Sequence, residues 1–565
     1  MKKYLMIMFI LPALMGCRTE NAVSQDSVFI DALLSRMTLQ EKIGQMTQVD
    51  RRYLKDDSDI QKYFMGSLLS GGNGGPEINT AESWADMVDH YQKLASETRL
   101  GIPLIYGVDA VHGHNNVSGA TIFPQNIGLG CTGDPDLVRK VAEITALEVA
   151  ATGIDWTFSP CVAVTDDIRW GRSYEGFSQD PEITAELGTA AVQGYQGKSL
   201  KDKGTIAACA KHYIGDGGTT WGTGDNKYLI DRGDTRLTEE ALREIHLPAY
   251  IDAVNAGVAT VMASYNSWNG DKCHGHEYLM TDLLKNELGF KGFIITDWAG
   301  INGLTDTYKN DIVKAVNAGV DMVMVPGTNT VGEDDYDTFF KYAVEAVQEG
   351  LIPMKRINDA VRRILQVKVD LDLFKDPYAS RDLLENFGSD EHRAVAREAV
   401  RKSLVVLKND NRILPVSEKI TRIHVAGSAA DDIGQQCGGW TITWQGEKGP
   451  ITPGTSILEA IRKRIPSAEI TFSADGSGAA GADLCLLVVG ENPYAEGRGD
   501  VEKLFLSDED RSVAETVRKT NVPTIAVLLS GRPMIITDEL AHWDAFVAAW
   551  LPGTEGAGIP DILFG

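Results

Sequence analysis

Apolar runs of strand length alternate with amphipathic stretches over the first part of the chain. Between residues 31 and 373 these runs are LIYGVDA, TIAACAKH, VATVMASY, GFIITDW and VDMVMVP. The stretches between them, such as residues 136–152 and 238–256, space their apolar positions as a helix does. Strands that alternate with helices form a parallel sheet under covering helices. At this length the pattern predicts an α/β fold, with a TIM-like (β/α)8 barrel over residues 28–373.

The pattern changes at residues 374–390, which read FKDPYASRDLLENFGSD and lack periodic apolar spacing. We interpret this polar stretch as an interdomain linker. A second α/β pattern follows, with strand-like runs IHVAGS, LCLLVVGE, TIAVLLSG and AFVAAW and helical stretches such as residues 508–519. It predicts a smaller α/β sandwich domain over residues 391–565. The chain stops at DILFG without a closing strand, so we expect the C-terminus of this domain to be truncated.

The N-terminus has the pattern of a bacterial export signal. Lys2 and Lys3 precede an apolar run over residues 4–14, and the sequence LMGC follows. We expect residues 1–17 to be a signal peptide and Cys17 to be lipidated, which predicts a periplasmic or membrane-anchored lipoprotein. The alternative is an ordinary signal peptide in which Cys17 is incidental. The other six cysteines leave pairing open, although Cys209 and Cys485 lie in apolar runs typical of buried free thiols.

Composition excludes several classes of function. The chain of 565 residues has room for two large domains and carries a formal net charge of −25. So negative a protein repels phosphate backbones, so we expect no nucleic-acid partner. The sequence contains no GxxxxGK[ST] loop, no HExxH and no CxxC, which leaves nucleotide and zinc chemistry without a motif. We therefore predict no cofactor and no metal.

Carboxylates follow two apolar runs that lie far apart in the chain. Asp297 ends the run in GFKGFIITDWAG, and Glu491 and Glu496 follow the run in LCLLVVGENPYAEGRGD. Glycoside hydrolysis needs two carboxyl groups that flank the bond, one to attack or stabilise the sugar carbon and one to protonate the leaving oxygen. Between them, Trp440 and Trp444 lie in the glycine-rich GGWTITWQG, where an indole face suits a sugar ring. These features predict a sugar-cleaving enzyme.

Other polar residues recur where the predicted barrel strands end. They are Asp109, the pair Lys211 and His212, and Tyr265, in addition to Asp297. The carboxyl ends of barrel strands carry the chemistry in such folds, so we expect these side chains to meet at one site. Structural alternatives exist: Asp297 as a helix N-cap, and Lys211 with His212 as a buried polar pair. Two more are Glu491 as a structural residue and the tryptophans as core aromatics.

The ordered set of motifs resembles glycoside hydrolase family 3, and most of all its β-glucosidases and β-glucan exohydrolases. The motifs are LLSRMTLQEKIGQMTQ, YGVDAVHGHNN, FPQNIGLG, PCVAVTDDIRWGRSYEGFSQDP, CAKHYIGDGG, GFKGFIITDW, GGWTITWQG, GENPYAE and AAWLPGTEGAG. The resemblance covers essentially all of the chain after the signal peptide. It implies a (β/α)8 barrel followed by an α/β sandwich, with the site at their junction.

The resemblance also implies roles for single residues. Asp297 matches the family's nucleophile, and Glu496 in GENPYAE matches the acid/base of the exohydrolase branch, supplied by the second domain. The residues that match its sugar pocket are Asp109, Arg172, Lys211, His212 and Tyr265. Trp298 and Trp444 match the aromatic pair that clamps the next sugar. Arg172 has the alternative role of bracing loops through Asp166, Asp167 or Glu175.

One branch of the family takes its proton donor from a histidine, in a loop followed by Asp-Ser/Thr-His. This chain reads KHYIGDGGTTWGTGDNKY and lacks that sequence, which argues against the aminosugar branch. We therefore predict an exo-acting, retaining β-glucosidase that removes terminal non-reducing glucosyl residues from β-linked gluco-oligosaccharides or β-glucans. For Glu496 we expect a raised pKa, as a proton donor requires. The alternatives are a β-xylosidase of the same family and a non-catalytic sugar-binding lipoprotein.

Overall fold

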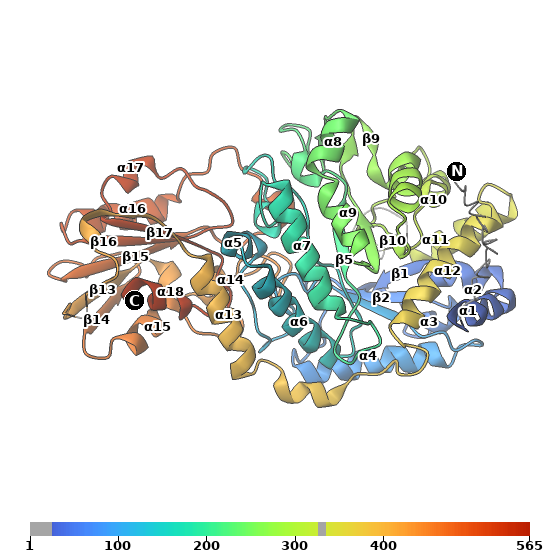
Figure 1. Cartoon of the computed structure of the whole chain (residues 1–565), viewed down its shortest axis with the longest axis horizontal. Coiled ribbons are helices and arrows are strands. Elements are labelled where there is room, and N and C mark those ends of the chain that lie inside the picture. Colours follow the sequence, from blue (N-terminus) through green and yellow to red (C-terminus); the bar gives the residue numbers. More distant parts are fainter. Residues whose placement is uncertain (1–24, 226, 326–334, 418) are drawn as a thin grey trace, which may run out of the picture.

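The chain folds into two units that lie side by side along the long axis of the molecule (Figure 1). The computed structural model describes residues 25–225, 227–325, 335–417 and 419–565. The expected signal peptide and Cys17 lie outside the described residues, so the lipid anchor stays a prediction. Within the described ranges, none of the helices has both the length and the apolar character that a membrane span requires.

The first unit is a closed barrel of parallel strands. Its strands are β1 (Thr47–Asp50), β2 (Ser67–Ser70), β3 (Ile105–Val108), β4 (Trp156–Thr157), β5 (Cys209–Tyr213), β7 (Thr260–Ala263), β10 (Phe293–Ile295) and β11 (Val323–Met324). They form two parallel sheets, in the orders β11-β1-β2-β3-β4 and β10-β7-β5. Parallel bridges from Trp156 to Ala207 and from Ile295 to Met322 join the sheets at both seams. The barrel that the apolar pattern predicts is confirmed.

Helices surround the barrel and turn their apolar stripes toward it. The described helices of this unit are α1 (Gln25–Arg36), α2 (Leu39–Gln45), α3 (Asp59–Lys62), α4 (Ala81–Ser96), α5 (Asn126–Thr132), α6 (Pro135–Ala151), α7 (Pro181–Gln196), α8 (Glu239–Ile245), α9 (Pro248–Asn255), a π-helix (Tyr278–Glu287), α10 (Tyr308–Ala318), α11 (Tyr336–Gln348) and α12 (Met354–Asp370). In α12, Ile357, Val361 and Ile364 recur at helical spacing and are buried, whereas Met354 and Lys355 at its start are exposed.

The helical stretch expected over residues 238–256 is two helices, not one. α8 ends at Ile245 and α9 begins at Pro248. Proline has no N–H to donate and its ring clashes with the preceding turn, so it ends one helix and starts the next. After the break, α9 packs against α7 and β5.

The second unit is a six-stranded sheet with helices on both faces. Its strands, in sheet order, are β12 (Val405–Asn409), β17 (Ala545–Trp550), β16 (Thr524–Leu529), β15 (Leu484–Gly490), β13 (Arg422–Ala426) and β14 (Glu469–Ser473). Its described helices are α13 (Asp390–Ser403), α14 (Ile433–Cys437), α15 (Ile457–Arg464), α16 (Asp508–Arg518), α17 (Thr537–Leu540) and α18 (Gly558–Phe564). All neighbouring strands are parallel except β12 and β17. The predicted α/β sandwich is confirmed.

Alternation along β15 builds both cores of this unit. Leu484, Leu486 and Val488 pack in the cluster on the α15 and α18 face, and Leu487 and Val489 pack in the cluster with α16. Successive side chains of a strand point to opposite faces, so a strand apolar at every position is buried on both sides. The edge strands β12 and β14 are missing from the predicted set because most of their side chains are partly exposed and no long apolar run marks them.

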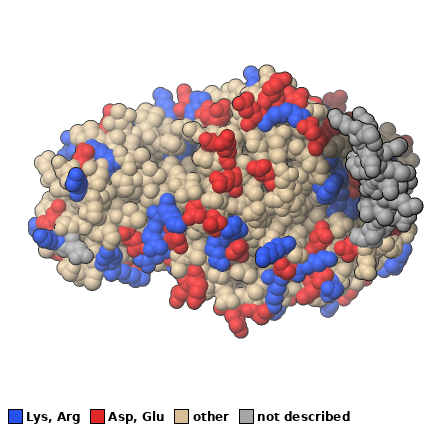
Figure 2. All heavy atoms as spheres, viewed as in Figure 1, with Lys and Arg blue, Asp and Glu red and all other residues tan. Residues whose placement is uncertain are grey.

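The polar stretch over residues 374–390 runs from α12 toward α13 and contains the 3-10 helix η6 (Arg381–Asn386). The boundaries 28–373 and 391–565 stay a prediction. On the face in Figure 2, Lys and Arg side chains are interspersed with Asp and Glu side chains. All six cysteines among the described residues are free thiols, and five of them, Cys209 and Cys485 included, are buried.

Candidate active site

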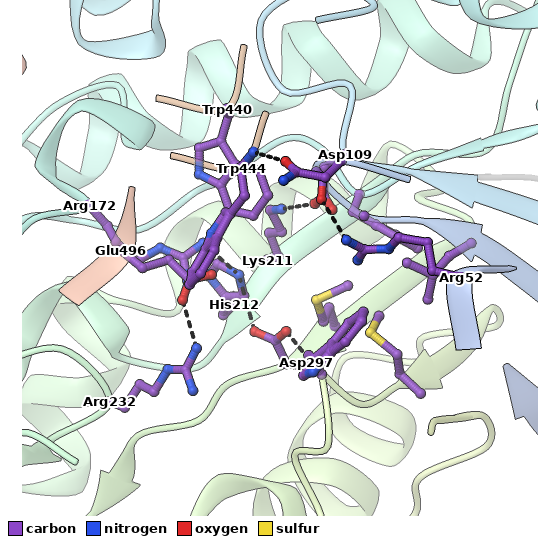
Figure 3. A pocket seen from close by; sticks show the side chains of 18 of the residues that line it. Arg52, Asp109, Arg172, Lys211, His212, Arg232, Asp297, Trp440, Trp444 and Glu496 are labelled. Atoms are coloured by element: carbon purple, nitrogen blue, oxygen red, sulfur yellow. Dashed lines mark hydrogen bonds and ion pairs between the residues drawn. The ribbon is translucent and has the colours of Figure 1, made fainter. Parts of the chain in front are cut away.

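A cavity of about 350 Å³ lies where the second unit meets the mouth of the barrel. Most of its lining comes from residues at or after the carboxyl ends of barrel strands, and Trp440, Trp444 and Glu496 come from the second unit (Figure 3). Both predicted catalytic carboxylates, Asp297 and Glu496, line this one cavity although they are far apart in sequence. The arrangement is a site shared between two units.

Asp297 lies two residues after the end of β10, and its loop holds it in place. Its Oδ1 accepts the backbone N–H of Trp298 at 2.6 Å, and its own N–H donates to Nε2 of His274 at 3.0 Å. The second oxygen, Oδ2, lies 3.6 Å from Nε2 of His212. Burial raises the pKa of Asp297 to about 6, and the charge of Glu496 acts in the same direction. The alternative that Asp297 is a helix N-cap is wrong, because Asp297 precedes a loop and not a helix.

Glu496 lies in the loop after β15 and is held by two arginines. Oε2 accepts from Nη2 of Arg232 at 2.6 Å, and Oε1 lies 3.8 Å from Nη1 of Arg172. Burial alone would raise the pKa of Glu496, but the guanidinium groups of Arg232 and Arg172 hold it below its ordinary value. The expectation of a raised pKa is therefore wrong for this resting state, because the sequence did not show that Arg232 lies against the carboxylate.

The predicted sugar-pocket residues form a buried polar group around the carboxylates. Nζ of Lys211 donates to Asp109 at 3.1 Å. Arg172 donates from Nε and Nη2 to both oxygens of Glu175, at 2.9 and 2.8 Å. The bracing expected of Arg172 is thus present, and the same side chain still faces the cavity.

His212 is fixed in one tautomer by its neighbours. Nη2 of Arg172 lies 3.2 Å from Nε2, and a guanidinium can only donate, so Nε2 is the acceptor. Nδ1 then carries the proton and donates to Asp216 at 2.8 Å. Burial lowers the pKa of His212 well below its ordinary value, and the nearby Arg172 and Lys211 lower it further. A neutral imidazole with Nε2 as acceptor has no proton to give toward Asp297.

Cys161, His212 and Asp216 bring one possible ligand atom each within 4.8 Å of one another. Burial raises the pKa of the Cys161 thiol to about 12, which disfavours the thiolate that a metal would need. Nδ1 of His212 is already engaged with Asp216. We interpret the group as a hydrogen-bonded pair beside a buried thiol.

Aromatic side chains stand at the second-unit side and at the barrel side of the cavity. Trp298 is half-buried and meets the ring of Tyr53 edge-on at 5.8 Å. Trp444 is also half-buried, and its backbone N–H donates to Oδ1 of Asn73 at 2.8 Å. Trp440 is buried and donates from Nε1 to Glu175, so it combines a structural role with a place in the lining.

Tyr265 is not among the described residues that line the cavity. The guanidinium of Arg232 lies 4.0 Å from the centre of its ring, and its hydroxyl donates to the carbonyl of Trp298. The tyrosine therefore supports two residues that do line the cavity.

Five polar residues of the lining were not predicted from the sequence: Arg52, Tyr53, Asn73, Tyr228 and Arg232. Arg52 and Tyr53 directly follow β1, so a polar turn after a strand end was the available signal. For Arg232 and Tyr228, which lie in a loop without periodicity, the sequence contained no such signal.

Glu491 is held outside the cavity lining by an ion pair with Arg532. Its Oε1 accepts from Nε and Nη2 of Arg532, both at 3.0 Å, and its Oε2 accepts from the hydroxyl of Tyr494 and the N–H of Gly531. Both carboxylate oxygens of Glu491 therefore accept structural hydrogen bonds, which agrees with the structural alternative for this residue.

We expect Glu491→Ala to lower the free energy of unfolding by roughly 3 kcal/mol, because it leaves the buried guanidinium of Arg532 without its partner. Chemical denaturation measures the loss, with the exposed Glu509→Ala as a control that leaves stability unchanged. An unchanged midpoint for Glu491→Ala would contradict the structural role.

Family models match both units of the chain. Residues 38–367 match the glycosyl hydrolase family 3 N-terminal domain, and residues 404–565 match the C-terminal domain of that family. The chain is 33% identical to a lysosomal beta glucosidase of Dictyostelium discoideum, over 96% of this chain and 71% of that protein. It is 31% identical to a periplasmic beta-glucosidase of Salmonella typhimurium, over 95% of this chain and 72% of that protein.

A solved structure is also similar. The exo-1,3/1,4-beta-glucanase of a Pseudoalteromonas species superposes with a TM-score of 0.89 at 41% identity, over 96% of this chain and 69% of that chain. Both units take part in these matches.

Proposed function

The chain belongs to glycoside hydrolase family 3, and from this premise we propose that it is an exo-acting, retaining β-glucosidase with Asp297 as nucleophile and Glu496 as acid/base. That it is a glycoside hydrolase follows from the family and from its β-glucosidase relatives. One observation carries the finer proposal: Asp297 of the barrel and Glu496 of the second unit line the same cavity.

The mechanism proceeds through a covalent intermediate. An oxygen of Asp297 attacks the anomeric carbon while the bond from that carbon to the leaving oxygen breaks, and Glu496 gives that oxygen its proton. Water then attacks the glycosyl ester, Glu496 takes the proton back, and free sugar leaves with Asp297 restored. Because Arg232 donates to Oε2 of Glu496 in the resting site, Oε1 is the oxygen that carries the proton to the leaving group.

Buried polar groups support binding of a chain end. Asp109, Arg172, Lys211 and His212 are closely paired with one another or with carboxylates around Asp297, and all line the cavity. Such a group suits the hydroxyls of a single terminal sugar, whereas the middle of a chain needs an open groove. The half-buried Trp298 and Trp444 are then available to the next sugar.

A substrate panel tests the proposal. We expect release of glucose from the non-reducing ends of β-linked gluco-oligosaccharides, and faster cleavage of an aryl β-glucoside than of the matching β-xyloside. Proton NMR should show the β-anomer as first product. A faster xyloside would favour the β-xylosidase alternative, an α-anomer would exclude retention, and no turnover at all would leave the binding lipoprotein.

The pH dependence follows from the paired carboxyl groups. In the reactive state, Asp297 and Glu496 together carry one proton. The pKa of Asp297 is about 6, and the pKa of Glu496 is below its ordinary value. This proton is lost as the pH rises through about 6, so kcat/KM for an aryl β-glucoside should fall above that pH. It should also fall in acid, where both groups are protonated. A kcat/KM that stays level well above pH 6 would contradict the assignment.

We also propose that the protein is exported, in line with the periplasmic relative from Salmonella typhimurium. Lipidation at Cys17 belongs to this proposal. Labelling of cells with a fatty-acid probe should mark the wild-type protein and leave Cys17→Ala unlabelled.

A further inference from the structure

The loop that carries Glu496 also carries Asp500, whose carboxylate holds two barrel loops at once. Oδ1 accepts the backbone N–H of Gly171 at 2.9 Å. Oδ2 accepts the backbone N–H groups of Leu229, Ile230 and Asp231 at 3.1, 3.0 and 2.9 Å. One side chain of the second unit therefore satisfies four donors of the barrel. Four such bonds to a charged acceptor form a strong and directional attachment.

Two of these four donors directly precede an arginine that faces Glu496, and the other two lie close to one of these arginines in the sequence. Gly171 precedes Arg172, and Asp231 precedes Arg232. Arg232 donates to Oε2 of Glu496, and Arg172 lies near Oε1. The acid/base and the carboxylate that positions both of its arginine neighbours thus belong to one short loop.

We propose that Asp500 is a positioning residue that docks the second unit on the barrel and aims Arg172 and Arg232 at Glu496. This inference rests on the proposed function of Glu496. Asp500 does not line the cavity, and it acts on the acid/base by positioning the two arginines.

The backbone at these loops requires such an attachment. Arg232 has φ 60° and Glu496 has φ 54°, both in the left-handed region that side chains other than glycine seldom adopt. Such a conformation costs free energy, so neighbouring bonds must hold each of these residues there. The three bonds from residues 229–231 to Asp500 end directly before Arg232.

The contact between the units is also close at the backbone. A Cβ on Gly171 would lie 2.1 Å from the carbonyl oxygen of Glu496 and 2.7 Å from Cα of Gly499. Trp170 donates from Nε1 to Asp231 at 2.8 Å, which ties the two barrel loops to each other. Nη2 of Arg532 donates to the carbonyl of Gly499 at 2.7 Å, beside Asp500. The loops are thus braced on both sides of the carboxylate.

Several charged groups act on Glu496, and the test must separate them. Burial raises the pKa of Glu496, whereas Arg232, Arg172 and Lys211 lower it. The charge of Glu496 in turn raises the pKa of Asp231 and of Asp297. Displacing the arginines from Glu496 removes cations from both catalytic carboxyls, and this raises both pKa values. The limbs of the pH profile should therefore move to higher pH.

The experiment compares kcat/KM profiles of the wild type, Asp500→Asn and Arg232→Gln on an aryl β-glucoside. We expect Asp500→Asn to lower kcat/KM roughly 10²-fold, as a displaced catalytic group does, and to move the basic limb to higher pH. Arg232→Gln should move the limb in the same direction while it leaves the bonds of Asp500 in place. The double variant should show less than the sum of the two shifts, because both act through one contact. Asp508→Asn, exposed at the start of α16, is the control with a wild-type profile.

A loss of stability alone would reduce the amount of active enzyme without moving a limb. Asp500→Glu keeps the carboxylate but displaces the loops, so it should shift the basic limb by less than Asp500→Asn does. If Asp500→Asn does not fold, Asp500→Glu is the variant that tests the proposal. If whichever of these two variants folds has its basic limb at the wild-type pH, the proposal is overturned. Fully additive limb shifts in the double variant would overturn it as well. A wild-type protein inactive on β-glucosides would instead refute the proposed function, so the two failures are distinguishable.

Discussion

Asp297→Ala is expected to lower turnover of every β-glucoside roughly 10⁵-fold, the scale of loss seen when a catalytic nucleophile is removed. Without the carboxylate no glycosyl-enzyme can form, and water in its place is a far weaker nucleophile. The fold should survive, because the backbone N–H of Trp298 that Asp297 caps is next to the cavity and can bond to water. Steady-state kinetics on aryl glucosides and on disaccharides measure the loss.

The control for this variant is Asp306→Ala, an exposed aspartate further along the same loop region, which should keep wild-type rates. Added azide should not restore a β-configured product in Asp297→Ala, since azide that replaces the nucleophile attacks from its side and inverts the carbon. Near wild-type rates for Asp297→Ala would show that the nucleophile is another residue.

Glu496→Ala should show a different signature that depends on the leaving group. Loss of a general acid costs about 10²–10⁴-fold where the leaving oxygen needs a proton, so disaccharides should suffer most. Activated aryl glucosides need little protonation and should still form the glycosyl-enzyme. Azide should then speed their turnover and yield β-glucosyl azide, because it attacks the intermediate without help from a base. Rates across a series of leaving groups, with and without azide, measure both effects.

Glu491→Ala is the matched control for Glu496→Ala, five positions away on the same loop. Its partners are Arg532, Tyr494 and Gly531, so it should lose stability and show no azide rescue. If Glu491→Ala showed the leaving-group signature and Glu496→Ala did not, the acid/base role would pass to Glu491.

Periodicity in the sequence predicted the architecture because burial repeats at fixed spacing. The runs that became β3, β5, β7, β10 and β11 are apolar; Asp109 follows β3, Asp297 follows β10, and Lys211 and His212 lie near the end of β5. In a parallel barrel these strand ends meet on one face, so Asp109, Lys211, His212 and Asp297 could be placed together from the sequence. Pro248 was the local signal that would have divided the helical stretch over residues 238–256 into two helices.

The electrostatics of the site could not be predicted in this way. Arg232 and Glu496 lie 264 residues apart, in loops of two different units, and neither loop has a period that fixes its path. The choice between Glu491 and Glu496 likewise depends on Arg532, 41 residues after Glu491, which takes one glutamate out of the cavity. The sign of the pKa shift at Glu496 follows from these contacts and is opposite to the sequence-based expectation.

The two-unit α/β architecture, the strand-end residues and the family could therefore be predicted from the residues in order, since each depends on local pattern or on ordered motifs. The charge pairs depend instead on how the chain packs in space: Arg232 with Glu496, Arg532 with Glu491, and Asp500 with two barrel loops. Charge pairing acts over a few ångströms in space and follows no period along the chain, so it becomes visible only when each unit has folded and the second unit lies against the barrel.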